Sequence, residues 1–368
     1  MRRSRGFSMV ELMVGLVLAM VVATIVMQAL AFYENQKRIT SGGSDSAING
    51  ALALFQVKRE ARQAGFGLTS PSGLLCGLGV NIYYNGSTVF NGANLTPLLI
   101  ADGASNAPDQ IRFARSQSTY GIAPAIIVKN MPNTSSNVTT GASAGIKNND
   151  LFMVGAANGS KICTLMQATK DAQATGNGWD LQHNPSSPYN PSNPNNAFTT
   201  APAYVVGDIV IAMGPFALTN YRILCNDNAA PSATNSCDLV SYDVLTAGAT
   251  INWANTNLQH IASQIVDMQA QYGVAPANSD TVNQWVDATG SWATPSATDM
   301  RRIKAIRVAI VSRSSKYETN TVSPSSLVLW DKGLASERTV SLSAAQQHYR
   351  YRVYYQVIPL VNMIWANS

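Results

Sequence analysis

One carboxylate, Glu11, stands at the beginning of an apolar stretch near the amino terminus. The 21 residues from Leu12 to Phe32 carry no charge. A carboxylate at membrane depth costs a few kcal/mol on insertion scales, so such a group normally has a partner of opposite charge. We therefore interpret Glu11 as one half of an ion pair. The alternative is an acid that reaches the membrane interface, because Glu11 lies only one turn from the start of the segment.

The four cysteines all follow this apolar stretch: Cys76, Cys163, Cys225 and Cys237. An even number in a chain that leaves the cytoplasm indicates two disulfides, although four cysteines permit three pairings. Cys225 and Cys237 are favoured as a local pair, because they enclose a turn-rich stretch whose closure contributes about 3 kcal/mol on the chain-entropy model. That choice leaves Cys76 with Cys163. Buried free thiols are the alternative, and no C-x-x-C spacing supports zinc or thioredoxin-like chemistry.

The sequence offers little for catalysis or cofactor binding. The three histidines are far apart and show no H-x-x-x-H spacing: His183, His260 and His348. A metal site or a histidine base is therefore not expected. Neither a G-x-S-x-G motif nor a phosphate-binding loop is present. We predict no enzymatic activity, no cofactor and no metal.

A basic cluster lies before and within a strand-like segment. It consists of Arg301, Arg302, Lys304, Arg307, Arg313 and Lys316. Alternation along a strand places Arg307 and Arg313 on one face. Such a face is either a solvated sheet surface or a contact for DNA or an acidic partner, and DNA binding of that kind weakens steeply with salt. The net charge adds little to the DNA interpretation, because it falls from +5 to +2 without Arg2, Arg3 and Arg5.

A long amino-terminal helix must position Glu11. Its first part is close to the roughly 20 residues needed to cross a bilayer, and the arginines before it favour a cytoplasmic amino terminus. Its second part is amphipathic, with a stripe at spacings of three and four residues: Ile48, Leu52, Phe55 and Arg59. Gly65 and Gly67 then provide a stop. We expect one helix of about 60 residues and about 90 Å, with a bend or melted turn at Gly42 and Gly43.

An ordinary secretory signal peptide is the alternative for this region. Ala29-Leu30-Ala31 resembles a small-residue cleavage site, with cleavage before Phe32. The apolar region is longer than the usual stretch of about 7–15 residues, and an acid inside it is unusual. These two features favour the membrane-helix interpretation.

Residues 5–14, RGFSMVELMV, resemble the class III signal of type IV pilins and type II secretion pseudopilins. In that family a membrane-embedded aspartyl prepilin peptidase cuts after the glycine, here Gly6, and the new amino-terminal residue, here Phe7, is N-methylated. The resemblance implies that Glu11 is the family's glutamate, which pairs with the positive amino terminus of the next subunit. It also implies a leader at 1–6, a helix at 7–67 with its transmembrane part at about 9–33, and a body at 68–368.

The rest of the chain predicts a β-rich body. Short runs of β-branched and aromatic residues predict strands at 80–84, 110–115, 125–130, 151–156, 161–166, 208–213 and 221–225. Later segments alternate as strands, the last two with one buried face: 266–272, 306–311 and 350–357. Residues 182–200 are too rich in Pro, Asn and Ser for a helix or a central strand and predict an exposed loop. The expected fold class is α+β and pilin-like, a long helix packed on an antiparallel sheet with long loops.

Within the pilins, the body resembles the PilW family of minor pilins. The resemblance is carried by VKREARQAGFG, IVDMQAQYGV, IKAIRVAIVSRS and RYRVYYQVIPLVNMIW. It covers the helix and much of the C-terminal third, whereas residues from about 70 to 255 do not share it. It implies a minor pilin that helps prime assembly of a type IV pilus at the tip. The implied partners are the prepilin peptidase, other minor and major pilins, a tip adhesin and, before assembly, the inner membrane.

The implied location is the bacterial inner membrane, crossed once with a cytoplasmic amino terminus, and then the pilus at the cell surface. Twitching motility and cell adhesion are the processes that such a pilus serves. Two other functions stay open at this stage. One is a minor pseudopilin of a type II secretion system, which follows the same amino-terminal rules. The other is a tip subunit that binds DNA or a surface through the basic strand face.

Overall fold

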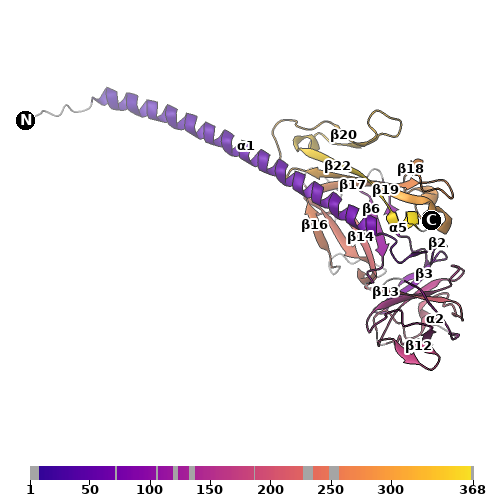
Figure 1. Ribbon diagram of the computed structural model, residues 1–368. Helices are drawn as coiled ribbons and strands as arrows, with labels where there is room; N and C mark the ends of the chain where they lie inside the picture. Colours follow the sequence, from indigo (N-terminus) through magenta and orange to yellow (C-terminus); the bar gives the residue numbers. More distant parts are fainter. Residues whose placement is uncertain are drawn as a thin grey trace, which may run out of the picture.

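The computed structural model describes residues 8–70, 73–104, 107–118, 123–131, 137–185, 187–226, 235–247 and 257–365. A long helix, α1 (Met9–Gln63), extends from a β-rich body and touches it only with its second half (Figure 1). The fold class is α+β, as predicted. The helix is continuous through Gly42 and Gly43, so the melted turn expected there is absent. Packing explains the continuity, because Gly42 is buried next to Ser314 and Ser315 where α1 meets the body.

The end of α1 lies at the predicted stop. Gly65 follows with a φ of +82°, a conformation that side chains with a Cβ rarely adopt. The short C-terminal helix α5 (Val361–Trp365) supplies a cap for the last carbonyl groups. Asn362 Nδ2 donates to the carbonyl oxygens of Gln63 and Ala64, at 3.2 and 3.1 Å. The end of α1 is thereby joined to the C-terminal helix α5.

The part of the body that holds α1, called here the helix lobe, contains two antiparallel sheets. Their strand orders are β16-β15-β14-β6-β5 and β18-β17-β19-β22. The strands are β5 (Leu98–Ala101), β6 (Gln110–Arg115), β14 (Ala217–Cys225), β15 (Cys237–Asp243), β16 (Gln259–Ser263), β17 (Ile265–Val274), β18 (Gln284–Val286), β19 (Ile303–Arg313) and β22 (Tyr351–Pro359). One hydrophobic core joins α1 to both sheets. Short helices α3 (Val244–Ala247) and α4 (Ala297–Arg302) flank the strands.

A second part of the body, called here the insert lobe, lies at the far end from the start of α1 (Figure 1). Its sheets have the orders β4-β3-β10-β9-β13-β7 and β11-β12-β8. The strands are β3 (Val80–Tyr84), β4 (Ser87–Ala93), β7 (Ala125–Ile126), β8 (Val138–Thr140), β9 (Leu151–Gly155), β10 (Cys163–Gln167), β11 (Gln173–Thr175), β12 (Gly178–Leu181) and β13 (Ile209–Gly214). The pairing of β3 with β10 is parallel, and the other pairs are antiparallel. The short pair β1 (Thr69–Ser70) and β2 (Gly73–Leu74) lies between α1 and this lobe in the chain.

The insert lobe is mostly one excursion of the chain. Strands β6 and β14 are neighbours in the five-stranded sheet, and Arg115 pairs with Ala217 at the point where they diverge. The chain from 116 to 216 therefore leaves the helix lobe and returns to the adjacent strand. Its two hydrophobic cores are separate from the core around α1.

One sequence expectation about burial is wrong. Strand β19 was expected to bury one face, yet all 11 of its residues are buried. Helix α1 covers one face, and the hairpin of β20 (Ser326–Trp330) and β21 (Arg338–Ser341) packs on the other with Trp330 in the core. Periodicity alone does not reveal this second cover.

The Pro- and Asn-rich segment 182–200 is anchored on the insert lobe instead of forming a free loop. It forms no long helix or strand, as expected, and contains the single turn α2 (Pro194–Ala197). Asn190 is buried, and its Nδ2 donates to the carbonyl oxygen of Gln167 at 2.8 Å. Thr88 of β4 donates to the carbonyl oxygen of Ala197 at 2.7 Å. Amide side chains and short turns thus fix a segment that composition alone describes as exposed.

Candidate functional site

The first turn of α1 carries Glu11, whose side chain is exposed. Among the residues that the structure describes, no group forms a hydrogen bond or an ion pair with it. The predicted processing residues Gly6 and Phe7 lie outside the described residues. Helix α1 is long and apolar enough to cross a membrane, and none of its most apolar window is buried against the body. Within the described residues, Glu11 is therefore an unpaired acid at the start of an exposed apolar helix.

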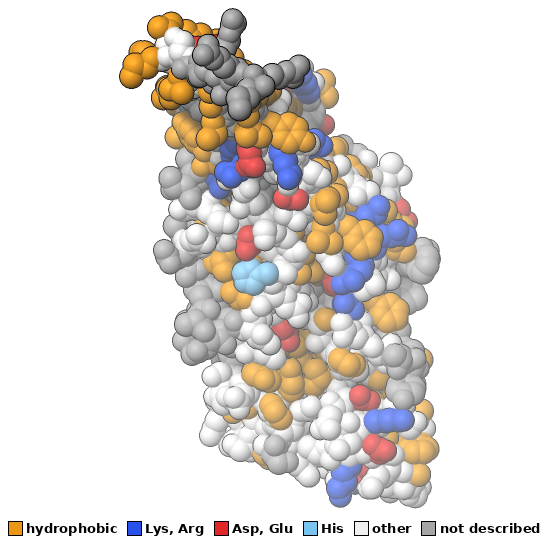
Figure 2. Space-filling model, turned by 90° about the vertical axis from the view of Figure 1, so that its left-hand side faces the viewer, with side chains coloured by type: hydrophobic (Ala, Val, Ile, Leu, Met, Phe, Trp, Pro, Cys, Tyr) orange, Lys and Arg blue, Asp and Glu red, His pale blue; other side chains and the backbone are white. Residues whose placement is uncertain are grey.

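The apolar character of α1 continues on its outer face beside the body. We define this outer face by Ile48, Leu52 and Phe55, which are 62%, 39% and 59% exposed. Figure 2 shows hydrophobic side chains concentrated on the helix, above a body surface with many uncharged groups. The amphipathic stripe read from the sequence is thus the side of α1 that faces away from the body.

The inner face of α1 is made of small residues. The buried positions of the helix are Gly42, Ser46, Gly50, Ala53, Val57, Glu60 and Ala61. A Cβ atom at Gly50 would lie 2.2 Å from Cε2 of Tyr354, so only glycine fits here without movement. The Tyr354 hydroxyl donates to the carbonyl oxygen of Ala47 at 2.9 Å, and the hydroxyls of Ser46 and Ser312 lie 2.9 Å apart. Close approach to the sheet, more than large apolar side chains, holds the helix in place.

A buried ion pair completes this inner face. Glu60 is 4% exposed, and Arg115 Nε lies 3.0 Å from its Oε2. Its partner comes from β6. A buried carboxylate needs such a partner. The pair fixes both the rotation of α1 and its position along the sheet.

The predicted basic strand face is not a surface. Lys304, Arg307 and Arg313 are only 1%, 2% and 4% exposed. Lys304 Nζ lies 2.8 Å from Asp280 Oδ1, and the Arg313 guanidinium carbon lies 4.5 Å from the ring centre of Tyr349. The expectation of an exposed basic face is wrong for these three residues, because each is enclosed by partners distant in the sequence.

Arg307 occupies the most enclosed position of the three. Its guanidinium carbon lies 5.0 Å from the ring centre of Trp285 and 4.7 Å from that of Trp330. Its Nε donates to Gln271 Oε1, and one terminal nitrogen donates to Asp331 Oδ2, both at 2.7 Å. The hydrogen bond from Arg307 lowers the pKa of Asp331. Arg307 therefore joins β17, β18 and the β20–β21 hairpin.

The other members of the predicted basic cluster lie on α4 and beyond β19. Arg301 is exposed, and Arg302 is partly exposed with its guanidinium 5.6 Å from the ring centre of Trp292. Lys316 contacts Asn35 of α1. These positions do not form one continuous strand face. The basis for DNA binding by that face is thereby removed.

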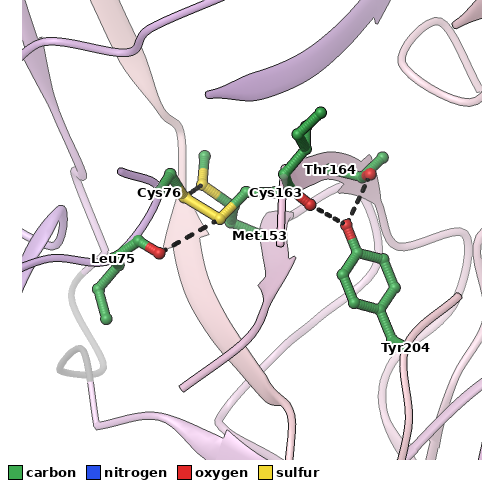
Figure 3. Close-up of a disulfide and its surroundings, with 7 residues drawn as sticks. Leu75, Cys76, Met153, Cys163, Thr164 and Tyr204 are labelled. Atoms are coloured by element: carbon green, nitrogen blue, oxygen red, sulfur yellow. Dashed lines mark hydrogen bonds between the residues drawn. A yellow bond between two sulfur atoms is a disulfide. The ribbon is translucent and has the colours of Figure 1, made fainter. Parts of the chain in front are cut away.

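The structure contains the disulfides Cys76–Cys163 and Cys225–Cys237. The second links β14 to β15, where the two cysteines are paired in register. The first ties the segment before β3 to the start of β10 in the insert lobe (Figure 3). Around it, Met153 Sδ lies 3.0 Å from Cys76 Sγ. Each lobe thus has its own covalent link.

The three histidines do not meet in space. His183 is buried beside Phe152 in the insert lobe, whereas His260 is exposed with Nδ1 3.1 Å from Asp238 Oδ2. His348 stacks on Tyr317 with 4.7 Å between ring centres. Within the described parts of the chain, no group of three or more His, Cys, Asp or Glu side chains is arranged to hold a metal ion.

Two family models match the chain. The family described as type IV pilus-assembly protein W matches residues 234–362, and the prokaryotic N-terminal methylation motif matches residues 1–27. The first match spans the sheet of β17, β19 and β22 and excludes the insert lobe; the second contains Gly6, Phe7 and Glu11. No curated protein and no solved structure matches the chain. The chain is thus similar to type IV pilus-assembly proteins over residues 234–362 and to N-terminally methylated prokaryotic proteins over residues 1–27, and the two matches together support a minor pilin of a type IV pilus.

Proposed function

We propose that this chain, which matches the PilW family and carries the class III signal of pilins, is a minor pilin that helps prime assembly of the type IV pilus near its tip. The observation that carries the proposal is the exposure of the apolar helix α1, together with the acid in its first turn. The helix is unburied over its membrane-length part and stays apolar on its outer face beside the body, and Glu11 in its first turn has no partner among the described residues. A helix of this kind needs lipid or other helices around it.

The proposed mechanism begins with processing at the inner membrane. Cleavage after Gly6 by the prepilin peptidase frees the amino group of Phe7, and methylation keeps its positive charge. Glu11 lies within the first turn of α1, so the amine of one subunit can reach the acid of a neighbour when the helices are staggered. A carboxylate in lipid costs a few kcal/mol, and this pairing removes that cost in the filament. Glu11 thereby sets the register between subunits.

The outer face of α1 supplies the second contribution. Ile48, Leu52 and Phe55 pack against helices of neighbouring subunits once the chain has left the membrane. Complete burial of such a side chain stabilises by roughly 1.5–3 kcal/mol. Extraction therefore exchanges lipid contacts for protein contacts along the membrane-length part of the helix, and water contacts for protein contacts along the outer face.

The insert lobe supports a place near the tip. It lies at the end of the body farthest from the start of α1 (Figure 1). At the end of a filament no further body has to stack on this lobe, whereas a subunit inside the shaft has neighbours above it. The other minor pilins and a tip adhesin are the proposed partners there.

The first test is incorporation of a Glu11→Gln variant. The variant keeps the size of the side chain and removes its charge, so the register contact is lost while the body still folds. We expect tagged protein to accumulate in the membrane fraction and to fall at least about tenfold in sheared pili, in line with loss of a charged pair in lipid. Glu34→Gln is the matched control, because Glu34 lies on the same helix and forms only an exposed pair with Arg38. Undiminished incorporation of Glu11→Gln would contradict the mechanism.

The second test is mass spectrometry of the mature amino terminus. A methylated Phe7 is the expected result. A mature chain that begins at Phe32 would mean ordinary secretion and would remove the proposal.

A third test concerns the position of the protein in the filament. Gold particles bound to an epitope inserted at the exposed turn of Gly333 should mark pilus ends and not shafts.

A pseudopilin of a type II secretion system is the second candidate, since it uses the same amino-terminal signal. The match to the pilus-assembly family favours the pilus. Deletion of the gene separates the two, because loss of twitching supports the pilus and loss of exoprotein secretion supports the secretion system.

A further inference from the structure

A groove at the junction of the two lobes has a half-buried arginine, Arg112, in its floor. The groove has a volume of about 390 Å³ and is lined by Val89, Phe90, Ala93, Leu99, Ala101, Gln110, Arg112, Asn220, Tyr242 and Val244. A cross-strand row forms its floor, because Arg112 pairs with Leu99 on one side and with Asn220 on the other. Strand β4 of the insert lobe supplies Val89 and Phe90 as an apolar wall.

Arg112 lacks an anionic partner within the described residues. Its Nε is buried and has no hydrogen-bond acceptor, and the guanidinium carbon lies 5.4 Å from the ring centre of Phe90. Burial lowers the pKa of Arg112, but a guanidinium stays charged in proteins. Buried charges in folded proteins are normally paired. Within the part of the chain that the structure describes, no anion therefore compensates the positive charge of Arg112.

The neighbouring polar groups do not supply the missing charge. Asn220 Nδ2 donates to Gln110 Oε1 at 3.1 Å and to the Tyr242 hydroxyl at 2.9 Å. The acids on adjoining strand ends are engaged elsewhere. Asp109 accepts from the backbone of Gly103 and Ala270, and Asp243 accepts from the backbone of Leu245.

A second cation reinforces the positive character of this sheet face. Arg222 follows Asn220 by two residues on β14 and so lies on the same face. Burial lowers its pKa as well, and it interacts electrostatically with Tyr242. Two arginines thus lie on one face of the five-stranded sheet, and one of them, Arg112, lies beside the apolar wall.

We propose that this groove binds a small organic carboxylate. The carboxylate pairs with the guanidinium of Arg112, and its apolar ring or branched chain lies against Val89, Phe90 and Leu99. A guanidinium matches a carboxylate with two parallel hydrogen bonds. A monoanion fits better than a phosphate dianion, because the apolar wall penalises the second charge.

The test is calorimetric titration of the full-length protein in lipid nanodiscs, with empty nanodiscs as the blank. The probes are benzoate, isovalerate and glucuronate, and benzamide serves as the uncharged counterpart of benzoate. We expect at least one carboxylate to bind, benzamide to bind at least about tenfold more weakly, and Arg112→Gln to lose the carboxylate by a similar factor. Arg301→Gln removes the same charge from an exposed position and should leave binding unchanged.

A groove-filling variant covers the case in which Arg112→Gln does not fold. Val89→Trp places a large side chain over the groove from β4 without changing its charge, and it should abolish binding of the same probe. Failure of all three carboxylates to bind the unaltered protein overturns the proposal. Equal binding of benzoate and benzamide, or unchanged binding by folded Arg112→Gln or Val89→Trp, also overturns it.

Discussion

The guanidinium of Arg307 lies between two indole rings and joins three strands of the helix lobe. We predict that Arg307→Met lowers the free energy of unfolding by roughly 3 kcal/mol, since it removes charge-assisted hydrogen bonds to Gln271 and Asp331. Urea denaturation of the full-length protein in detergent, followed by tryptophan fluorescence, measures the change. Arg301→Met is the control and should change stability by no more than about 0.5 kcal/mol. A similar loss in both variants would mean that enclosure of Arg307 is not what stabilises the lobe.

Two buried acids make the stability of the helix lobe depend on pH. Burial raises the pKa of Asp109 to about 7 and that of Asp267 to about 6. In the unfolded chain these carboxyl groups have the usual pKa of 3.8. At a pH between 3.8 and the raised values, the folded state therefore holds protons that the unfolded chain has already released. Stability should rise as pH falls through the folded pKa values, by on the order of 2 kcal/mol between about pH 8 and pH 5. The gain in stability is complete once the pH is below 3.8, the pKa of these carboxyl groups in the unfolded chain.

Urea denaturation at a series of pH values tests this dependence. Asp109→Asn mimics the uncharged carboxyl group and should flatten the pH profile between about pH 8 and pH 5. Asp45→Asn changes an exposed acid on α1 and should leave the profile as it is. A profile that falls steadily as the pH is lowered from 8 would show that these two acids do not control stability in this range.

Residues with local signals were predictable from the sequence. Glu11 stands out because the charge-free stretch after it has membrane length, and Cys225 and Cys237 enclose a short turn-rich loop. The enclosure of Arg307 was not predictable, because Trp285 and Trp330 come from different strands. The groove around Arg112 was likewise not predictable, because its apolar wall comes from β4 of the insert lobe. Spacing along one segment identifies single side chains, but pairing between distant segments decides their surroundings.

Among the elements, α1 depends on close contact with β22. We predict that Gly50→Ala destabilises the helix lobe by about 1–3 kcal/mol, because the new Cβ overlaps the ring of Tyr354. Hydrogen exchange of the amides around Ala47 should rise in parallel, since the Tyr354 hydroxyl donates to that carbonyl. Gly43→Ala is a matched control in the same helix, where no atom lies within 4 Å of the new Cβ. It should be neutral or stabilise by up to about 1 kcal/mol, and an equal loss in both variants would contradict the packing argument.

The same helix shows what sequence patterns reveal about elements. Strands at 80–84 and 110–115 have the predicted bounds, and α1 stops where glycines were expected to stop it. The stripe of Ile48, Leu52 and Phe55 is also present in the structure, where it is exposed. Hydrophobic periodicity identifies such a stripe but not the surface that packs against it. Small residues at Ser46 and Gly50 form the face on the sheet, because the sheet brings its own large side chains. The burial of both faces of β19 was not predictable for the same reason, because alternation along β19 does not show that the β20–β21 hairpin packs on its second face.

At the scale of the whole molecule, the two lobes have separate cores and separate disulfides. The chain-entropy model assigns about 4.5 kcal/mol to the Cys76–Cys163 link, whose cysteines are 87 residues apart in the sequence. It assigns about 3 kcal/mol to the Cys225–Cys237 link, which spans 12 residues within one hairpin. The insert lobe is therefore expected to rely more on its disulfide than the helix lobe does.

We predict that replacing Cys76 and Cys163 together by alanine weakens the insert lobe by about 4.5 kcal/mol and leaves the helix lobe folded. Hydrogen exchange should show faster opening in β9 and β10, while protection of β17 and β19 is kept. Since α1 and its outer face belong to the helix lobe, the variant should still enter pili. The matched variant without Cys225 and Cys237 should instead affect β14 and β15. Equal loss of protection in both lobes after removal of Cys76 and Cys163 would show that the body unfolds as one cooperative unit, and the insert lobe would then be part of what holds α1 in place.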